Sequence, residues 1–204
     1  LLFSRTEPED ERVKFLLQAG FPFVCHGRTA LETPHPYVDY DNAAFTYQAA
    51  QQLIAASCRR LFIILPPERF TFARHMQQGL LQAVGEHGVG FEIARGITLD
   101  SKADMVRDHV AKRLAEPDPP DGFICGGEVS AMAVMSAAHD LKLEIGRDVR
   151  LVAKQTSGLF DQVRPRIETI YEDLSVAGGI MANKLLQQIA GSAPVPDLQV
   201  LLDR

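Results

Sequence analysis

The stretch LFIILPPERFTFARHMQQGLLQAVGEHGVGFEIA, residues 61–94, decides the fold class of this chain. It opens with a wholly apolar run of strand length at 61–65, which a Pro-Pro pair ends. Residues 71–86 then have the apolar spacing of an amphipathic helix, and Gly88 stops that helix. A second strand-like run follows at 91–94. This order of strand, helix and strand predicts a βαβ unit with parallel strands.

The same alternation extends to both ends of the chain. Apolar runs bounded by Gly or Pro predict buried strands, and apolar residues at helical spacing predict amphipathic helices. More strand–helix pairs occur than one small sheet can hold, so we predict an α/β protein with parallel sheets covered on both faces. Segment 29–40 shows no clear pattern and is expected to cross between subdomains. The other expected strands are 1–3, 21–25, 122–125, 149–153, 167–171 and 198–202, and the other expected helices are 9–19, 42–56, 101–114, 128–141 and 175–190.

Composition bounds the class of protein. The chain has 204 residues, 46% of them hydrophobic, which is enough for one large domain or two small ones. Its formal net charge of −5 argues against this chain alone forming a nucleic-acid-binding surface. No apolar run approaches the roughly 18–20 residues of a membrane span, and no secretory signal opens the chain. We therefore expect a soluble, cytoplasmic protein.

Motifs that carry chemistry are absent from the sequence. No phosphate-binding P-loop, dinucleotide-binding glycine motif or serine nucleophile elbow occurs, and the six His lack the spacing of a helical zinc site. The three cysteines, Cys25, Cys58 and Cys125, form no C-x-x-C pair and are expected to be buried free thiols. Paired carboxylates like those of glycosidases remain open, because 26 acidic residues allow many pairs. We expect no cofactor, no metal and no catalytic residue.

The carboxyl ends of the predicted strands are where a ligand would bind. Polar and aromatic side chains follow these strands, and carboxylates, Arg forks and stacked rings suit a sugar or a similar polyol. Single positions also have structural explanations, since Asp41 suits a helix cap and Glu128 suits the dipole at a helix N-terminus. The candidate ligand-binding residues are His26, Arg28, Asp41, Phe70, Phe72, Arg74, Glu128 and Gln155.

Three regions of the chain carry a resemblance to a known family. They are GFPFVCHGRT (20–29) with HPYVDYDNAAFTYQAAQQLIAASCRRLFII (35–64), then PDGFICGGEVSAMAVMSAAHDLKLEIGRDVRLVA (120–153), then RPRIETIYEDLSVAGGIMANKLLQQIAG (164–191). In this order they resemble sequence blocks in the effector domain of LacI/GalR-family bacterial transcription regulators. The resemblance covers essentially all 204 residues.

This resemblance implies a fold of periplasmic-binding-protein-like type (type I), with two α/β subdomains joined by three crossovers. We expect the crossovers near Asp41, Glu172 and Ala193. The N-terminal subdomain would comprise 1–41 and 173–193 and would lack its first βαβ unit, and the C-terminal subdomain would comprise 42–172 and 194–204. Members of the family also carry a helix-turn-helix headpiece, which this sequence lacks, and they dimerise through the effector domain.

The family's ligand positions carry over unevenly. Asp41 matches the Asp that opens the crossover helix, and Glu128 stands where an Asp follows a strand end. A frequent Arg of the family falls on Met76, for which Arg74 is a substitute, and an Asp falls on Gln155. His26 also replaces an acidic or polar residue. Loss of an Arg and an Asp together implies a neutral, larger pocket that would suit an oligosaccharide or glucoside.

The resemblance therefore implies a ligand-sensing, dimerising effector domain of a LacI-type regulator, without enzymatic activity. A sugar-like effector bound between the subdomains would modulate operator binding by the absent headpiece. A periplasmic sugar-binding protein of a transport system is the alternative, because it would share the fold. An enzyme such as a sugar isomerase or hydrolase on an α/β scaffold is a third possibility.

Overall fold

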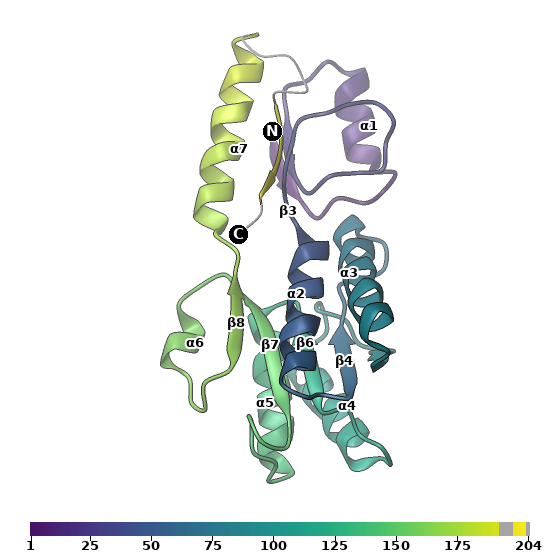
Figure 1. Cartoon of the computed structure of the whole chain (residues 1–204). Coiled ribbons are helices and arrows are strands. Elements are labelled where there is room, and N and C mark those ends of the chain that lie inside the picture. The colour runs from purple at the N-terminus through teal and green to yellow at the C-terminus, as the bar shows by residue number, and fades with distance from the viewer. Residues whose placement is uncertain (192–197, 203–204) are drawn as a thin grey trace. The chain divides into compact units, whose positions relative to one another are not determined.

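The structure is a computed structural model that describes residues 1–191 and 198–202. The chain divides into two compact units (Figure 1). Unit 1 comprises Leu1–Asp41, Glu68–His75 and Asp173–Arg204, and unit 2 comprises Asn42–Pro67 and Met76–Glu172. Each unit holds one parallel sheet with helices packed against it, so the predicted architecture of two parallel-sheet α/β subdomains is confirmed.

Unit 1 is built on a four-stranded sheet in the order β1-β2-β3-β9, with every neighbouring pair parallel. Helix α1 packs on one face, where Val13 and Leu16 meet Phe23 and Cys25. Helix α7 packs against the strands through a separate cluster that contains Ala177. The elements are β1 (Leu2–Ser4), α1 (Glu11–Gln18), β2 (Val24–His26), β3 (Tyr37–Tyr40), α7 (Leu174–Ile189) and β9 (Gln199–Leu202).

Unit 2 is built on a five-stranded parallel sheet in the order β5-β4-β6-β7-β8. The chain reverses direction across the sheet between β4 and β6, and ligands of open α/β sheets bind beyond the carboxyl ends of strands at such a switch point. Its elements are α2 (Asn42–Ala55), β4 (Arg60–Ile64), α3 (Thr71–His87, whose first turn is grouped with unit 1), β5 (Gly90–Ile93), α4 (Ala103–Ala115), β6 (Gly122–Cys125), α5 (Glu128–Asp140), β7 (Arg150–Gln155), α6 (Leu159–Gln162) and β8 (Glu168–Tyr171).

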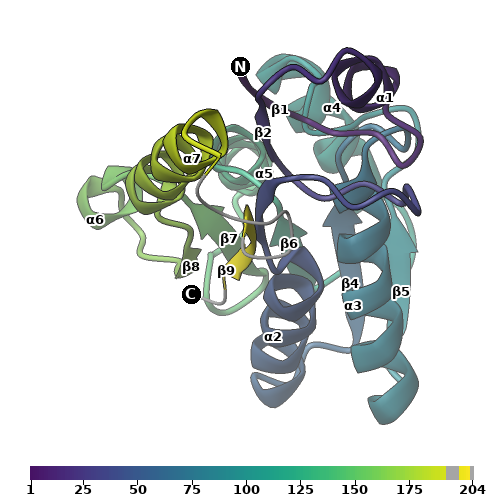
Figure 2. The same ribbon diagram turned by 90° about the horizontal axis from the view of Figure 1, so that it is seen from above.

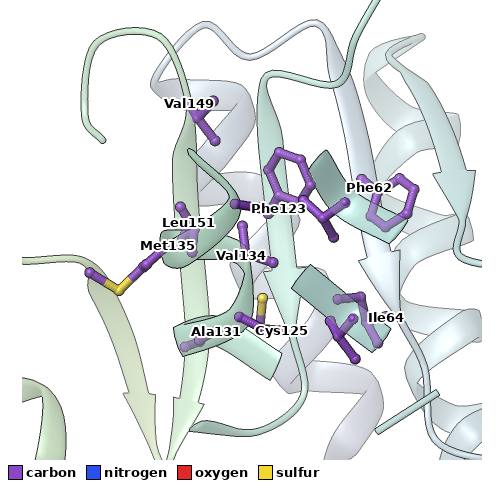
Figure 3. Packing of buried hydrophobic residues seen from close by; sticks show 14 of the residues in the cluster. Phe62, Ile64, Phe123, Cys125, Ala131, Val134, Met135, Val149 and Leu151 are labelled. Atoms are coloured by element: carbon purple, nitrogen blue, oxygen red, sulfur yellow. The ribbon is translucent and has the colours of Figure 1, made fainter. Parts of the chain in front are cut away.

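Alternation along the strands gives unit 2 a core on each face of its sheet. On one face, Phe62, Phe123 and Leu151 pack against α4 and α5 (Figure 3). The intervening side chains, such as Ile63 and Ile124, are fully buried on the opposite face. Helices α2 and α3 lie next to each other in both views (Figures 1 and 2), and α2 contacts β6 and β7.

The structure corrects two boundaries and adds two elements. Residues 194–204 were expected in the C-terminal subdomain, but β9 pairs with β3 in unit 1, so this assignment is wrong for 199–202. Segment 68–75 was likewise expected with 42–172 but belongs to unit 1. Strand β3, inside the segment without a clear pattern, and the short helix α6 were not predicted. The expected crossover near Ala193 lies outside the described residues.

The three cysteines are free and buried, as predicted. Burial raises the pKa of Cys25 and of Cys125 to about 12, and that of Cys58 to about 11. These thiols therefore act as small apolar core residues rather than as nucleophiles.

Candidate functional site

The predicted ligand-binding residues fall into two groups, one in each unit. Those in unit 2 are Met76, Glu128 and Gln155. Those in unit 1 include Phe70 and Phe72, because segment 68–75 is grouped with the N-terminal sheet. The unit 1 group is His26, Arg28, Asp41, Phe70, Phe72 and Arg74.

Thr6, just beyond β1, fixes the two chain segments that carry the unit 1 group. Its hydroxyl donates to the Arg28 carbonyl at 3.1 Å, and its carbonyl accepts from the Thr71 N–H at 2.9 Å. Gly27 permits this approach, because its φ is +108° and a Cβ there would lie 2.6 Å from Thr6 Oγ1. The turn after β2 and the first turn of α3 are thereby anchored to the same residue.

An ion pair orients the guanidinium group of Arg28. Its Nε lies 3.2 Å from Oδ2 of Asp39, a β3 residue whose side chain is 4% exposed. Burial raises the pKa of Asp39, although the nearby guanidinium group of Arg28 favours the ionised carboxylate. Asp39, two residues before the candidate Asp41, was not among the predicted ligand-binding residues.

His75 is a second residue that the sequence analysis missed. It lies within electrostatic range of Arg28 and Asp41, and burial together with Arg28 lowers the pKa of its imidazole. Its Nδ1 is buried and has no hydrogen-bond partner among residues 1–191 and 198–202. A neutral imidazole in this position offers a hydrogen bond to a ligand hydroxyl.

The aromatic residues of segment 68–75 differ in how much ring surface they expose to a ligand. The Phe70 ring is 5% exposed, and the guanidinium carbons of Arg5 and Arg69 lie 4.5 and 4.4 Å from its centroid. Phe72 stacks on Phe70 at 5.8 Å between centroids and is half-buried, so it has more surface to give to a sugar face. Arg74 is exposed and makes no ion pair within the described part of the chain.

Glu128, at the start of α5, fastens the loop that follows β7. Its Oε1 accepts hydrogen bonds from the Thr156 N–H at 3.0 Å and from the Ser157 N–H and hydroxyl at 2.9 Å. The loop and the helix start are thus tied together beside the switch point between β4 and β6. Glu128 has this structural role whether or not its second oxygen contacts a ligand.

Gln155 and Met76 are both buried in unit 2. Gln155 ends β7 with 6% exposure, and its Oε1 has no hydrogen-bond partner among the described residues. Met76 is fully buried, and its Cε lies 2.8 Å from where a Cβ on Gly126 would be. Met76 therefore shapes the apolar floor below Gly126, and it exposes no surface of its own.

A buried cation next to Gln155 was not foreseen. Lys154 Nζ lies 2.9 Å from Glu172 Oε2, donates to the Asn42 side-chain oxygen, and lies 5.0 Å from the centroid of the Phe45 ring. Asn42 is the first residue of unit 2 after unit 1, and Glu172 is the last before the chain returns. The Lys154 ammonium group therefore contacts both the residue at which the chain enters unit 2, Asn42, and the residue at which it leaves, Glu172.

These side chains are suited to binding rather than to covalent chemistry. Taken together, the two groups supply carboxylate, imidazole, guanidinium and amide groups as well as apolar surface, which is the set that recognises hydroxyl groups. No cluster of three or more His, Cys, Asp or Glu suited to a metal ion occurs in residues 1–191 and 198–202. Within the same residues, no helix has the length and apolar character needed to cross a bilayer.

Comparison with known proteins gives a consistent picture. The family described as periplasmic binding protein-like domain matches residues 50–203. The HTH-type transcriptional regulator AglR of Rhizobium meliloti (strain 1021) is 28% identical over 201 residues, which are 94% of this chain and 55% of AglR. The HTH-type transcriptional regulator CelR of Thermobifida fusca is 26% identical over 200 residues, 95% of this chain and 57% of CelR. The chain thus spans little more than half the length of these relatives.

Solved structures match the fold of nearly the whole chain. A LacI-family regulatory protein from Chloroflexus aggregans superposes with a TM-score of 0.87 at 24% identity, covering 98% of this chain and 72% of that one. A complex of the transcriptional regulator CelR with cellobiose has a TM-score of 0.86 at 22% identity, covering 98% and 62%. The expected likeness to LacI-family effector domains is confirmed at the level of fold and sequence family.

Proposed function

Because this chain belongs to the periplasmic binding protein-like domain family, we propose that it senses a neutral sugar for a LacI-type transcriptional regulator. The proposal rests on what the relatives of this chain are named as. AglR and CelR, which align with 94% and 95% of the chain, are both HTH-type transcriptional regulators. On this proposal the chain is a cytoplasmic effector-binding domain without enzymatic activity, and DNA binding belongs to a part of the protein outside it.

The chemistry of the two residue groups supports a sugar as the effector. Arg28, Asp41 and His75 lie together in unit 1, and they supply donors and acceptors for hydroxyl groups. Gln155 supplies a neutral amide with an unpaired oxygen from unit 2. An uncharged disaccharide satisfies these groups without burying a charge of its own. The cellobiose complex of CelR gives a relative with an effector of this class.

In the proposed mechanism, the sugar shifts a conformational equilibrium. A ligand changes the populations of two states only by as much as it prefers one of them. Complete release or capture of DNA would need roughly a 10⁴-fold difference in affinity between the states. In the proposed mechanism, contacts from residues of both units would give the sugar that preference.

We propose further that the protein acts as a homodimer. Val129 and Met132 lie three residues apart on α5, and their side chains are 60% and 36% exposed. Exposed apolar residues on a helix are commonly covered in a dimer interface. A monomer would instead favour the transport-type sugar-binding protein, which remains the second candidate function because it would share the fold.

Two measurements test these proposals. Sedimentation of the chain should give a dimer, and Met132→Lys should give a monomer with an unchanged circular dichroism spectrum. Calorimetric titration with cellobiose and maltose should detect binding that Asp41→Asn and Gln155→Leu each weaken at least about tenfold. Asp161→Asn and Gln78→Leu, at exposed positions outside both groups, are the matched controls. Equal effects of the site variants and of the controls would rule out the proposed binding residues.

A further inference from the structure

A pocket lies at the amino ends of strands β7 and β8, away from the candidate effector residues. Its cavity volume is about 340 Å³, and it is entirely within unit 2. Its walls are the last turn of α2, the turn at Ile145–Gly146 before β7, and the first residues of β7 and β8. Glu128 and Gln155 are at the opposite, carboxyl edge of the same sheet.

The base of this pocket is apolar and rigid. Leu53 of α2 and Val152 of β7, which lies on the sheet face that α2 covers, are 2% and 0% exposed. The neighbouring turn is held closed by hydrogen bonds from the Gly146 N–H to the Val149 carbonyl at 2.7 Å and from the Glu144 N–H to Asp148 Oδ2 at 2.8 Å. Such a floor accepts an aliphatic or aromatic side chain of moderate size.

Side chains of both charges line the same pocket, and none of them forms an ion pair within the described residues. Arg150 and Arg166 are exposed, and their guanidinium groups make no ion pair with any described residue. Glu168 is exposed and likewise has no ion-pair partner within residues 1–191 and 198–202. Gln52 also lines the pocket, and its buried Oε1 has no hydrogen-bond partner in those residues.

We propose that this pocket binds an apolar α-amino acid in its zwitterionic form. The carboxylate pairs with Arg150 and Arg166, which offer the fork-shaped donors that carboxylates prefer. The ammonium group donates to Glu168 and to the Gln52 amide oxygen, and the apolar side chain packs on Leu53 and Val152. A carboxylate without an amino group would leave Glu168 facing an anion, and an amine without a carboxylate would face two arginines.

This site is independent of the sugar proposal, because it shares no residue with either candidate group. It would give the protein a second small-molecule input carried entirely by unit 2. The volume of the cavity is large enough for an amino acid of the size of leucine or phenylalanine.

Titration calorimetry of the chain with L-leucine and L-phenylalanine tests the assignment directly. We expect saturable binding of at least one of them, and at least about tenfold weaker binding of its deaminated and decarboxylated analogues, 4-methylpentanoate and isoamylamine or 3-phenylpropionate and phenethylamine. Binding that is equally strong for an analogue lacking either charge would overturn the zwitterion assignment.

Single variants then connect the binding to the pocket. Arg150→Gln, Arg166→Gln and Glu168→Gln should each weaken amino-acid binding at least about tenfold, because each removes a charged partner. Arg59→Gln, an exposed arginine directly before β4 and outside the pocket, is the matched control and should bind as the parent chain does. All four positions are exposed, so unchanged melting temperatures will show that the variants fold.

The effector-group variant Gln155→Leu separates the two sites. It should leave the affinity for the amino acid unchanged. No heat with either amino acid at millimolar concentration, or loss of binding in Gln155→Leu with none in Arg150→Gln, contradicts the proposal.

Discussion

Lys154 Nζ and Glu172 Oε2 lie 2.9 Å apart, with the two side chains only 8% and 9% exposed. Burial of both charges is costly unless each one is paired, and Asn42 provides a further acceptor for the ammonium. The pair joins β7 to the residue at which the chain leaves unit 2. We infer that it fixes the crossover ends against the sheet that carries Gln155.

The Lys154–Glu172 pair should show strong energetic coupling. Lys154→Met or Glu172→Gln alone leaves one buried group without its partner, and each should lower the free energy of unfolding by about 3–5 kcal/mol. The double variant should cost clearly less than the sum of the two, since it removes both charges. Urea unfolding of the four proteins measures the coupling; additivity within about 0.5 kcal/mol would show that the pair does not act as a unit.

Two glycines of α3 should respond to alanine in opposite directions. At Gly79 a Cβ would lie 2.1 Å from the Ala43 carbonyl oxygen, whereas at Gly85 nothing lies within 4 Å. Gly79→Ala should therefore destabilise the chain by about 1–3 kcal/mol or more, because α2 and α3 must separate. Gly85→Ala should stabilise it by roughly 0.5–1 kcal/mol through helix propensity. Similar melting temperatures for the two variants would refute the close approach of these helices.

Acid should destabilise the fold through two histidines. Burial is the main cause that lowers the pKa of His35 and of His75 below 6.5 in the folded chain. The unfolded state therefore binds more protons as the pH falls through 6.5 toward these lowered values. The stability that the neutral imidazoles provide is present above that range and is lost on acidification.

The slope of unfolding free energy against pH, between about pH 7.5 and about pH 5.5, measures this effect. His35→Gln and His75→Gln should each reduce the slope, because each removes one imidazole whose pKa burial lowers. A parent chain whose stability does not change over this range would contradict the buried neutral state of these side chains.

Glu128 should control the mobility of the loop after β7. Its Oε1 accepts from the backbone N–H groups of Thr156 and Ser157, so Glu128→Ala removes a charged acceptor from both. Hydrogen exchange at these two amides should become at least about tenfold faster. Glu116→Ala, which alters an exposed carboxylate after α4, is the control. Unchanged exchange in Glu128→Ala would show that the loop is ordered by other contacts.

The local elements of this fold are largely predictable from sequence, because the apolar runs of β4, β6 and β7 and the helices between them have clear periods. Strand β3 was missed, since four residues that follow Pro36 and include Asp39 give little pattern. Its pairing with β9 joins Tyr37 to Gln199, and no local rule indicates a contact of that sequence separation. The same applies to segment 68–75, which is adjacent to unit 2 in sequence but packs on Thr6.

Prediction of the candidate site was limited in the same way, because contacts between residues far apart in the sequence could not be predicted. The carboxyl-end rule identified His26, Arg28 and Gln155 as candidates, because it depends only on the strand ends. It could not identify His75, which lies inside a helix, or the pairing of Lys154 with Asn42 and Glu172. A lysine directly after the predicted strand 149–153 was the available signal for that buried pair.

Thermal unfolding of the chain against a ligand panel tests the central claim most directly. The panel contains neutral mono- and disaccharides, sugar phosphates and nucleobases. At about 100 times its dissociation constant, a ligand adds roughly 2.7 kcal/mol, which for a chain of this size raises the melting temperature by about 5–10 °C. We predict such a shift with a neutral disaccharide, reduced in Asp41→Asn and Gln155→Leu. A shift with only a phosphorylated sugar or a nucleobase, or no shift with any member of the panel, would contradict the account of a neutral-sugar sensor.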